Sequence, residues 1–426
     1  MPVFFGKRGL KNMKKIQQIK PSFYDKFHCI GADCKKTCCQ EWSVIIYKEE
    51  FKKLKKNIKS ENLKKIFSEA FVPNKGTSLQ KTNLYKIKMK EDKRCPFLDE
   101  KGLCMLQKEC GYDLLFQTCK VFPREGLLYC NQRCELSLSL GCEEAVRLLL
   151  EEKDGFLLEV SEGKLDLGLI RGNIIESAYI TKKPVLHYFY DIKSLVIAVL
   201  QTRNYTLGQR MALLGIALEK IYHMDKEKNF NKIPNYIQWF LNEISQKNCQ
   251  YHSFFEKNKS NPHIKLLNTL QKHYKIARKF DIKQQLEKIN VSIEGYLNVE
   301  KNEIKSELEY NPLKYEKCVE EFELFLKKNP HVLENIIVCC AWYIGIPFAY
   351  NKNIWENYCI FAMVYSVYYF VLSICVKEDT TKEELIKYVV MISREVLHGS
   401  KNLKTLEEEL EKNESATLAH MIKLVL

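Results

Sequence analysis

Apolar side chains recur every three or four residues along most of the chain after residue 155. This is the spacing of one face of an α-helix. Strand patterns are few in this part, and long linkers rich in Gly, Ser or Pro are absent. The pattern predicts helices over residues 186–202, 206–223, 234–245, 264–279, 315–328, 381–396 and 403–426.

The first third of the chain has a mixed pattern. Residues 42–70 have helical spacing, whereas Tyr85, Ile87 and Met89 alternate with lysines, as in a half-buried strand. Residues 99–102 carry a turn signal, short strands are expected at 126–129 and 136–140, and a helix is expected after residue 142. We therefore predict a mainly α protein. Its parts are a basic leader (1–20), a small cysteine-rich α+β domain with short strands or hairpins (21–155) and a helical domain (156–426).

Two late segments, residues 336–350 and 358–376, carry no charged side chain. The second has about the length of a membrane span. Tyr, Ser, Cys or Pro residues interrupt both segments, and the first is too short. The sequence therefore favours two buried core helices over a membrane hairpin.

Cysteine is concentrated in the first third of the chain. Eleven of the 17 cysteines lie between residues 29 and 142. Residues 1–18 lack the apolar core and cleavage site of a secretory signal, so we predict a cytoplasmic protein. In that reducing compartment, clustered cysteines more often bind metal than form disulfides.

The cysteine pattern favours an iron–sulfur cluster over zinc. Thiolates are soft ligands that suit both. Zinc sites usually contain CxxC pairs, often with His, whereas here no such pair occurs and His28 is the one nearby histidine. The radical-enzyme pattern CxxxCxxC is not met either, because Glu41 stands where its third cysteine would be. No dinucleotide, P-loop, HExxH or GxSxG motif is present, so catalytic residues are not predicted.

The net charge of +14 comes mainly from lysines spread along the chain. A solvated basic surface explains them, and attraction to an acidic partner is the functional alternative. RGG tracts and nucleic-acid-binding signatures are absent. We therefore predict no nucleic-acid partner.

Several segments resemble the flagellin lysine-N-methylase family. They include residues 21–34, 38–42, 95–98, 102–104, 118–124 and 135–142, with weaker similarity at 200–205 and 210–215. The resemblance implies methyl transfer from S-adenosylmethionine to surface lysines of flagellin, with a cysteine-bound [4Fe-4S] cluster. The ligand candidates that it implies are Cys34, Cys38, Cys39, Cys95, Cys104 and Cys119, followed by Cys29 and Cys142.

Two questions stay open at this point. A cubane needs four ligands, so the eight candidates exceed the need. The CxxxCC core also occurs in small zinc- or iron-chelating proteins, so a metal-chelating scaffold or adaptor without catalytic activity is the alternative.

Methyl transfer requires a neutral lysine amine. Arg124 is the candidate for binding the donor carboxylate, and Tyr112 and Asp113 are further candidates for lining such a site.

Overall fold

The computed structural model of the protein describes residues 15–40, 44–73, 84–130, 132–164, 166, 168–175, 177–246, 249–257, 297–298, 309–310, 312–349, 352–397 and 417–426. The chain divides into two compact units. The cysteine-rich unit contains residues 1–128, 132–148 and 160–174, and the helical unit contains residues 129–131, 149–159 and 175–426. The predicted helix over 264–279 and most of that over 403–426 lie outside the described residues.

Most of one sheet lies in the cysteine-rich unit. Its strand order is β7-β1-β6-β5-β8, and β1 runs parallel to β6, with Gln18 opposite Cys134. The strands are β1 (Ile16–Pro21), β5 (Arg124–Tyr129), β6 (Arg133–Leu138), β7 (Leu158–Gly163) and β8 (Ile170–Ile175). The short strands predicted at 126–129 and 136–140 correspond to β5 and β6. The last residues of the predicted leader form β1.

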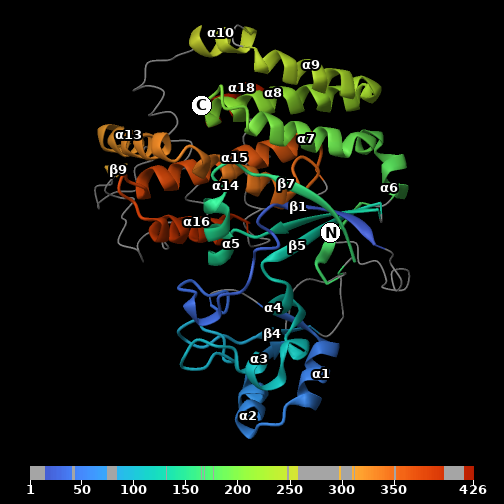
Figure 1. Ribbon diagram of the computed structural model, residues 1–426, viewed down its shortest axis with the longest axis vertical. Coiled ribbons are helices and arrows are strands. Elements are labelled where there is room, and N and C mark those ends of the chain that lie inside the picture. The colour runs from blue at the N-terminus through green and yellow to red at the C-terminus, as the bar shows by residue number, and fades with distance from the viewer. Residues whose placement is uncertain are drawn as a thin grey trace. The chain divides into compact units, whose positions relative to one another are not determined.

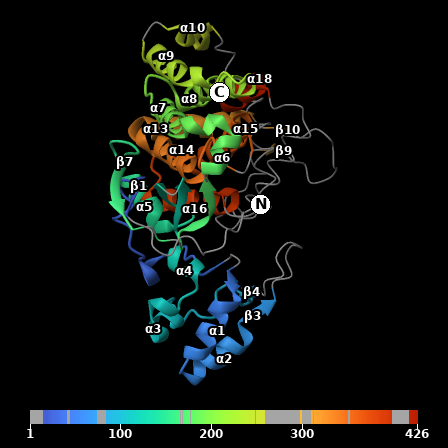
Figure 2. The same ribbon diagram turned by 90° about the vertical axis from the view of Figure 1, so that its right-hand side faces the viewer.

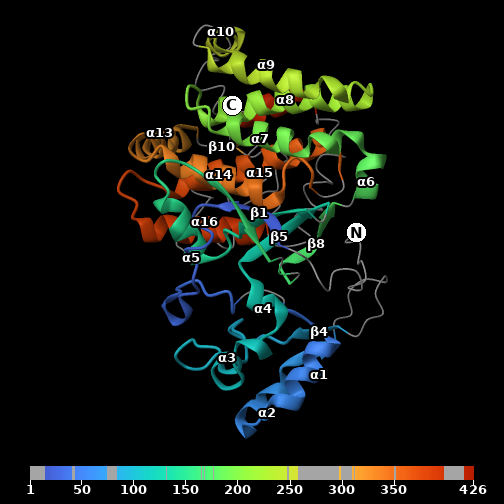
Figure 3. The same ribbon diagram turned by 45° about the vertical axis from the view of Figure 1, so that its right-hand side comes forward.

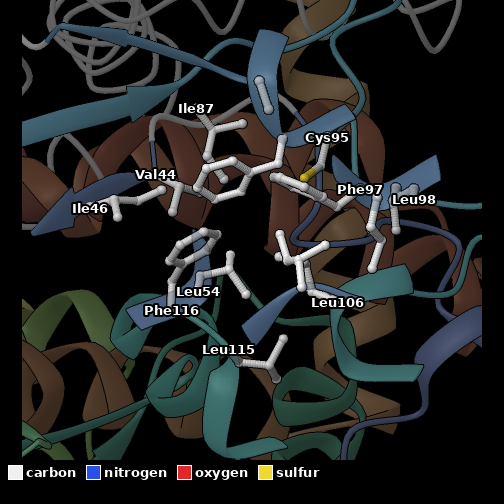
Figure 4. Packing of buried hydrophobic residues seen from close by; sticks show 14 residues of the cluster. Val44, Ile46, Leu54, Ile87, Cys95, Phe97, Leu98, Leu106, Leu115 and Phe116 are labelled. Atoms are coloured by element: carbon white, nitrogen blue, oxygen red, sulfur yellow. The ribbon is translucent and has the colours of Figure 1, made fainter. Parts of the chain in front are cut away.

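A second, smaller core forms around the sheet β2-β4-β3. Helices α1 and α2 lie beside these strands (Figure 2). The buried side chains include Leu54, Phe97 and Phe116, and the thiol of Cys95 lies among them (Figure 4). The elements are β2 (Ile45–Tyr47), α1 (Lys48–Asn57), α2 (Glu61–Glu69), β3 (Phe71–Pro73), β4 (Leu84–Ile87), α3 (Met105–Cys110) and α4 (Gln117–Val121).

Local sequence explains these elements. Ile87 is buried, whereas Lys86 and Lys88 are exposed, as the alternating pattern predicts. The helical pattern of residues 42–70 breaks into two helices, because the Ser60 hydroxyl accepts a hydrogen bond from the Leu63 N–H (3.4 Å) and starts α2.

The helical unit packs around α15 (Ile354–Cys375), which contacts α8, α13, α16 and α18 (Figures 1 and 3). Helix α7 lies between α8 and α14 in the same views. The other helices are α5 (Glu143–Glu151), which the two units share, α6 (Ser177–Lys182), α7 (Phe189–Leu200), α8 (Leu207–Lys226), α9 (Ile233–Ser245), α10 (Gln250–Lys257), α13 (Pro312–Lys328), α14 (His331–Ile344), α16 (Lys382–Leu397) and α18 (Leu418–Val425). The mainly α prediction is therefore confirmed.

Among the described helices, α15 alone has the length and apolarity of a membrane span. Its most apolar window is 94% buried inside the protein, so its side chains pack against protein. Core helices of helical domains reach the same length and apolarity. This agrees with the prediction of a buried core helix.

Stability should fall steeply at alkaline pH. Burial raises the pKa of Cys340 and of Cys375 from 9.0 to about 12. Below pH 9 these thiols are protonated in both states. Between pH 9 and 12 these thiols ionise in the unfolded chain but stay protonated in the folded protein. The free energy of unfolding therefore decreases by up to about 1.4 kcal/mol per thiol for each pH unit. Urea unfolding at pH 8, 9.5 and 11 measures this, and Cys375→Ala should show a shallower dependence. Equal slopes for both proteins would contradict it.

Candidate metal centre

The loop that carries Cys34, Cys38 and Cys39 is fastened to the segment around Cys95. Gly31 begins the turn ahead of it with φ +58°, a conformation that favours glycine. The Cys39 carbonyl accepts a hydrogen bond from the Cys95 N–H (2.8 Å), and Gln40 and Arg94 form a β-bridge. These main-chain contacts bring two distant cysteines together.

Cys95 and Cys104 flank a tight turn, as predicted. The Asp99 carboxylate accepts hydrogen bonds from the N–H groups of Lys101 and Leu103, both at 2.9 Å. Gly102 has φ +77°, and Leu98 and Cys104 form a β-bridge. The turn thereby holds Cys104 at the start of α3.

Cys119 lies on the short helix α4, which α1 orients. The Glu50 carboxylate accepts hydrogen bonds from the Gln117 N–H (2.6 Å) and from the Tyr47 N–H (2.8 Å). A carboxylate at a helix N-terminus is favourable because it satisfies a main-chain donor and complements the helix dipole. The sequence patterns did not identify Glu50, because its partner in α4 is 67 residues away.

Four thiols form one mutually interacting group: Cys39, Cys95, Cys104 and Cys119. An ionised Cys39 or Cys104 would raise the pKa of Cys95, an ionised Cys39 would raise that of Cys104, and an ionised Cys39, Cys95 or Cys104 would raise that of Cys119. Each of the six pairs is therefore close enough to interact. Burial raises the pKa of Cys95 to about 12 and also raises that of Cys104, whereas Cys119 is exposed at the surface of the protein. We call these four residues the thiol quartet.

Three other candidates form a neighbouring group. A hydrogen bond with the Cys39 thiol raises the pKa of Cys38, and burial and the charges of Cys39, Cys142 and Cys119 raise it further. Burial raises the pKa of Cys34 to about 12, with contributions from the charges of Glu143 and Cys142. Cys38 thus interacts with members of both groups, Cys39 and Cys119 of the thiol quartet and Cys142 of the neighbouring pair. Among the described candidates, Cys29 is exposed and lies outside both groups.

The described residues contain no group of three or more His, Cys, Asp or Glu side chains that could hold a single metal ion. A cubane places four irons and four sulfides between its ligands, so its thiolates stand further apart than those around one ion. The donor set of the thiol quartet is all cysteine, as in most clusters. The donor set therefore fits a cluster, and four cysteines are also a donor set for zinc.

Arg124 is engaged within the cysteine-rich unit. Its Nη2 donates to the Phe27 carbonyl (2.9 Å), and its guanidinium lies over the rings of Phe27 (4.7 Å to the centroid) and Tyr24 (5.9 Å). These contacts give it a structural role. Its binding to a methyl donor remains a prediction.

Tyr112 and Asp113 lie at the surface near α4. The Tyr112 hydroxyl donates to the Lys120 carbonyl (3.3 Å), and Tyr112 is 58% exposed. The ammonium groups of Lys53 and Lys120 both donate to the Asp113 carbonyl, at 3.2 and 2.8 Å. These are ordinary surface contacts, and a role of either residue in lining a substrate site remains a prediction.

The helical unit contains a buried ion network centred on Glu334 of α14. Its carboxylate accepts hydrogen bonds from Arg210 Nη1 (2.6 Å) and Arg203 Nη2 (2.8 Å). Arg210 also donates to the carbonyls of Tyr205 (2.8 Å) and Leu200 (3.0 Å). The network fixes the α7–α8 connection to α14. In the sequence, the feature that points to this network is Glu334, an acidic residue in an otherwise apolar helix.

The family model of the FliB lysine N-methylase C-terminal domain matches residues 193–424, which is more than half of the chain. The chain belongs to the FliB lysine N-methylase family. The lysine-N-methylase of Salmonella typhimurium is 33% identical over 149 residues, which cover 34% of this chain and 35% of that protein. The flagellar biosynthetic protein FliU of Salmonella muenchen is 33% identical over 149 residues, which cover 84% of FliU. The matched part thus spans about a third of the Salmonella typhimurium relative. No solved structure matches the chain.

The FliB match and the candidate metal centre lie in different parts of the chain. The matched residues 193–424 fall within the helical unit and include the Glu334 network. The thiol quartet lies in the cysteine-rich unit. The family-model match therefore rests on the helical unit, and the case for a cluster rests on the thiols themselves.

Proposed function

We propose that this protein is an S-adenosylmethionine-dependent protein-lysine N-methyltransferase that acts on surface lysines of flagellin and carries a [4Fe-4S] cluster. Its membership of the FliB lysine N-methylase family supports the reaction. The relative FliU is named a flagellar biosynthetic protein, which supports a flagellar substrate. The single observation that carries the proposal is the family match over more than half of the chain.

The residues that would hold the cluster are the thiol quartet, Cys39, Cys95, Cys104 and Cys119. They are the candidates of which every pair interacts. They come from three separate segments, which the main-chain contacts of Cys39, the Asp99 turn and Glu50 hold in place. A bound cluster supplies a one-electron redox centre and iron–thiolate bonds that join these segments.

The proposed reaction makes one demand on the substrate lysine. Its nitrogen lone pair forms the new N–C bond while the S–C bond of the donor breaks, and S-adenosylhomocysteine leaves. An ordinary lysine has a pKa near 10.4 and is protonated at neutral pH. The enzyme must therefore desolvate the ammonium group or place a base beside it before transfer.

An assay on anaerobically purified protein tests the proposal. Flagellin and a methyl-deuterated donor are added, and mass spectrometry of flagellin peptides measures deuterated methyl-lysine. The isotope separates new transfer from methylation acquired in the cell. We expect deuterated methyl-lysine, together with about four irons and four sulfides per chain. S-adenosylhomocysteine in place of the donor is the control.

Two outcomes would count against the proposal. Cluster-replete protein that leaves flagellin unmodified would refute the activity. Colourless protein that contains stoichiometric zinc and transfers no methyl group would instead support the scaffold alternative.

A further inference from the structure

Glu143 ties the start of α5 to the loop of Cys34, Cys38 and Cys39. Its Oε2 accepts a hydrogen bond from the Lys36 N–H at 2.7 Å and lies 3.5 Å from Cys34 Sγ, whose thiol donates to it. Lys36 precedes Glu143 by 107 residues, so this contact joins two distant segments of the cysteine-rich unit. Both contacts are made by one carboxylate oxygen.

The contact complements a second anchor on the same loop. The Cys39 carbonyl is held by the Cys95 N–H at 2.8 Å, and the Thr37 hydroxyl accepts from the Cys39 N–H at 3.2 Å. Thr37 and Cys38 lie between Lys36, which contacts Glu143, and Cys39, which contacts Cys95. The loop is therefore held at both ends, with the Glu143 contact before its vicinal cysteines and the Cys95 contact after them.

A charged acceptor suits this task. Hydrogen bonds from a main-chain N–H to a carboxylate are about twice as strong as those between neutral groups. A carboxylate in the first turn of a helix is also stabilised by the helix dipole. Glu143 is the first residue of α5, so the helix fixes the position from which it reaches the loop.

We infer that Glu143 is a positioning residue that holds the Cys34–Cys39 loop in the geometry in which Cys39 joins the thiol quartet. This inference rests on the proposed cluster. Groups that orient metal ligands without touching the metal typically change metal affinity by 10- to 100-fold when they are replaced. Glu143 would affect cluster binding indirectly, through its contact with Lys36 and the position of the loop.

Three variants separate this role from a general effect on folding. Glu143→Ala removes the acceptor. Glu143→Gln keeps an oxygen that accepts from the Lys36 N–H. Glu61→Ala is the matched control, because Glu61 is also the first residue of a helix, with a carboxylate that bonds to the exposed Lys64.

The first measurement is the rate at which anaerobic protein loses iron to a chelator, followed by the cluster absorbance. We expect Glu143→Ala to lose iron about tenfold faster than the parent protein, with an unchanged circular dichroism spectrum. Glu143→Gln should restore most of the retention, and Glu61→Ala should match the parent. Equal iron loss from Glu143→Ala and the parent would overturn the inference. Iron loss from Glu143→Gln as fast as that from Glu143→Ala would also overturn it, because the Gln side chain still presents an acceptor oxygen to the Lys36 N–H.

The second measurement does not require a cluster. In metal-free protein, the Lys36 amide proton should exchange about tenfold faster in Glu143→Ala than in the parent. Unchanged exchange would show that Glu143 does not hold the loop. If the parent protein contains no iron or sulfide, the proposed cluster fails, and the exchange comparison separately decides whether the carboxylate fastens the loop.

Discussion

Replacing Glu334 with alanine should destabilise the helical unit by about 3–5 kcal/mol, the usual cost of removing one partner from a buried ion pair. The Glu334 side chain is 2% exposed and that of Arg210 is 10% exposed. Burial already lowers the pKa of Arg210, so its charge is poorly solvated. Without the carboxylate, that cation stays inside the protein with two carbonyl partners alone.

Thermal unfolding followed by circular dichroism measures this effect. For a unit of this size we expect the midpoint to fall by on the order of 10 °C. The matched control is Glu378→Ala, because Glu378 pairs with Lys328 at the surface, where the two side chains are 49% and 63% exposed. Exposed pairs contribute about 0–1 kcal/mol. A Glu334→Ala midpoint no lower than that of Glu378→Ala would show that the network does not stabilise the unit.

Periodicity predicted α7, α8, α9, α13 and α16 well, because each is long and has a buried face. The helix ends were less accurate where side-chain caps decide them. Helix α15 begins at Ile354 instead of residue 358, because the Asn353 side chain accepts from the Glu356 N–H (2.9 Å) and the Glu356 carboxylate accepts from the Asn353 N–H (3.1 Å). A search for uncharged residues excludes Glu356, although that residue completes the cap.

Pairing between distant segments was not predictable from local pattern. Strand β7 lies in a part of the chain where helical spacing dominates, and its residues alternate only weakly in burial. Strand β1 fell within the predicted basic leader, because residues 1–20 are rich in basic side chains and lack an apolar core. Lys20 is buried and its ammonium group pairs with Asp25, a contact that composition does not reveal.

The same limit applies to the candidate metal centre. Sequence identified the cysteines and the turn at Asp99, which are local features. The resemblance placed Cys29 and Cys142 after the other six candidates, but it did not select four of the six. That selection depends on the β-bridge between Gln40 and Arg94 and on the contact between Glu50 and α4. These long-range contacts bring Cys39, Cys95, Cys104 and Cys119 together and leave Cys29 outside.

Replacing Cys39 with serine should abolish cluster binding. Cys39 interacts with each of the other three members of the thiol quartet. Serine keeps the size of the side chain and the main-chain hydrogen bond to Cys95, so the fold should persist. Its hydroxyl is a much poorer ligand than a thiolate for the soft site of a cluster. We expect the iron content of anaerobically purified protein to fall at least about tenfold, together with methyl transfer.

Cys29→Ser is the matched control for Cys39→Ser. Cys29 is exposed and lies outside both thiol groups, so its replacement should leave iron content and absorbance unchanged. Cys38→Ser tests the neighbouring group, because Cys38 interacts with Cys39, Cys119 and Cys142. If Cys38→Ser loses the cluster while Cys39→Ser retains it, the ligands are centred on Cys38, Cys34 and Cys142, and the thiol quartet is not the site. Loss in Cys39→Ser alone places the cluster on the four thiols of which every pair interacts.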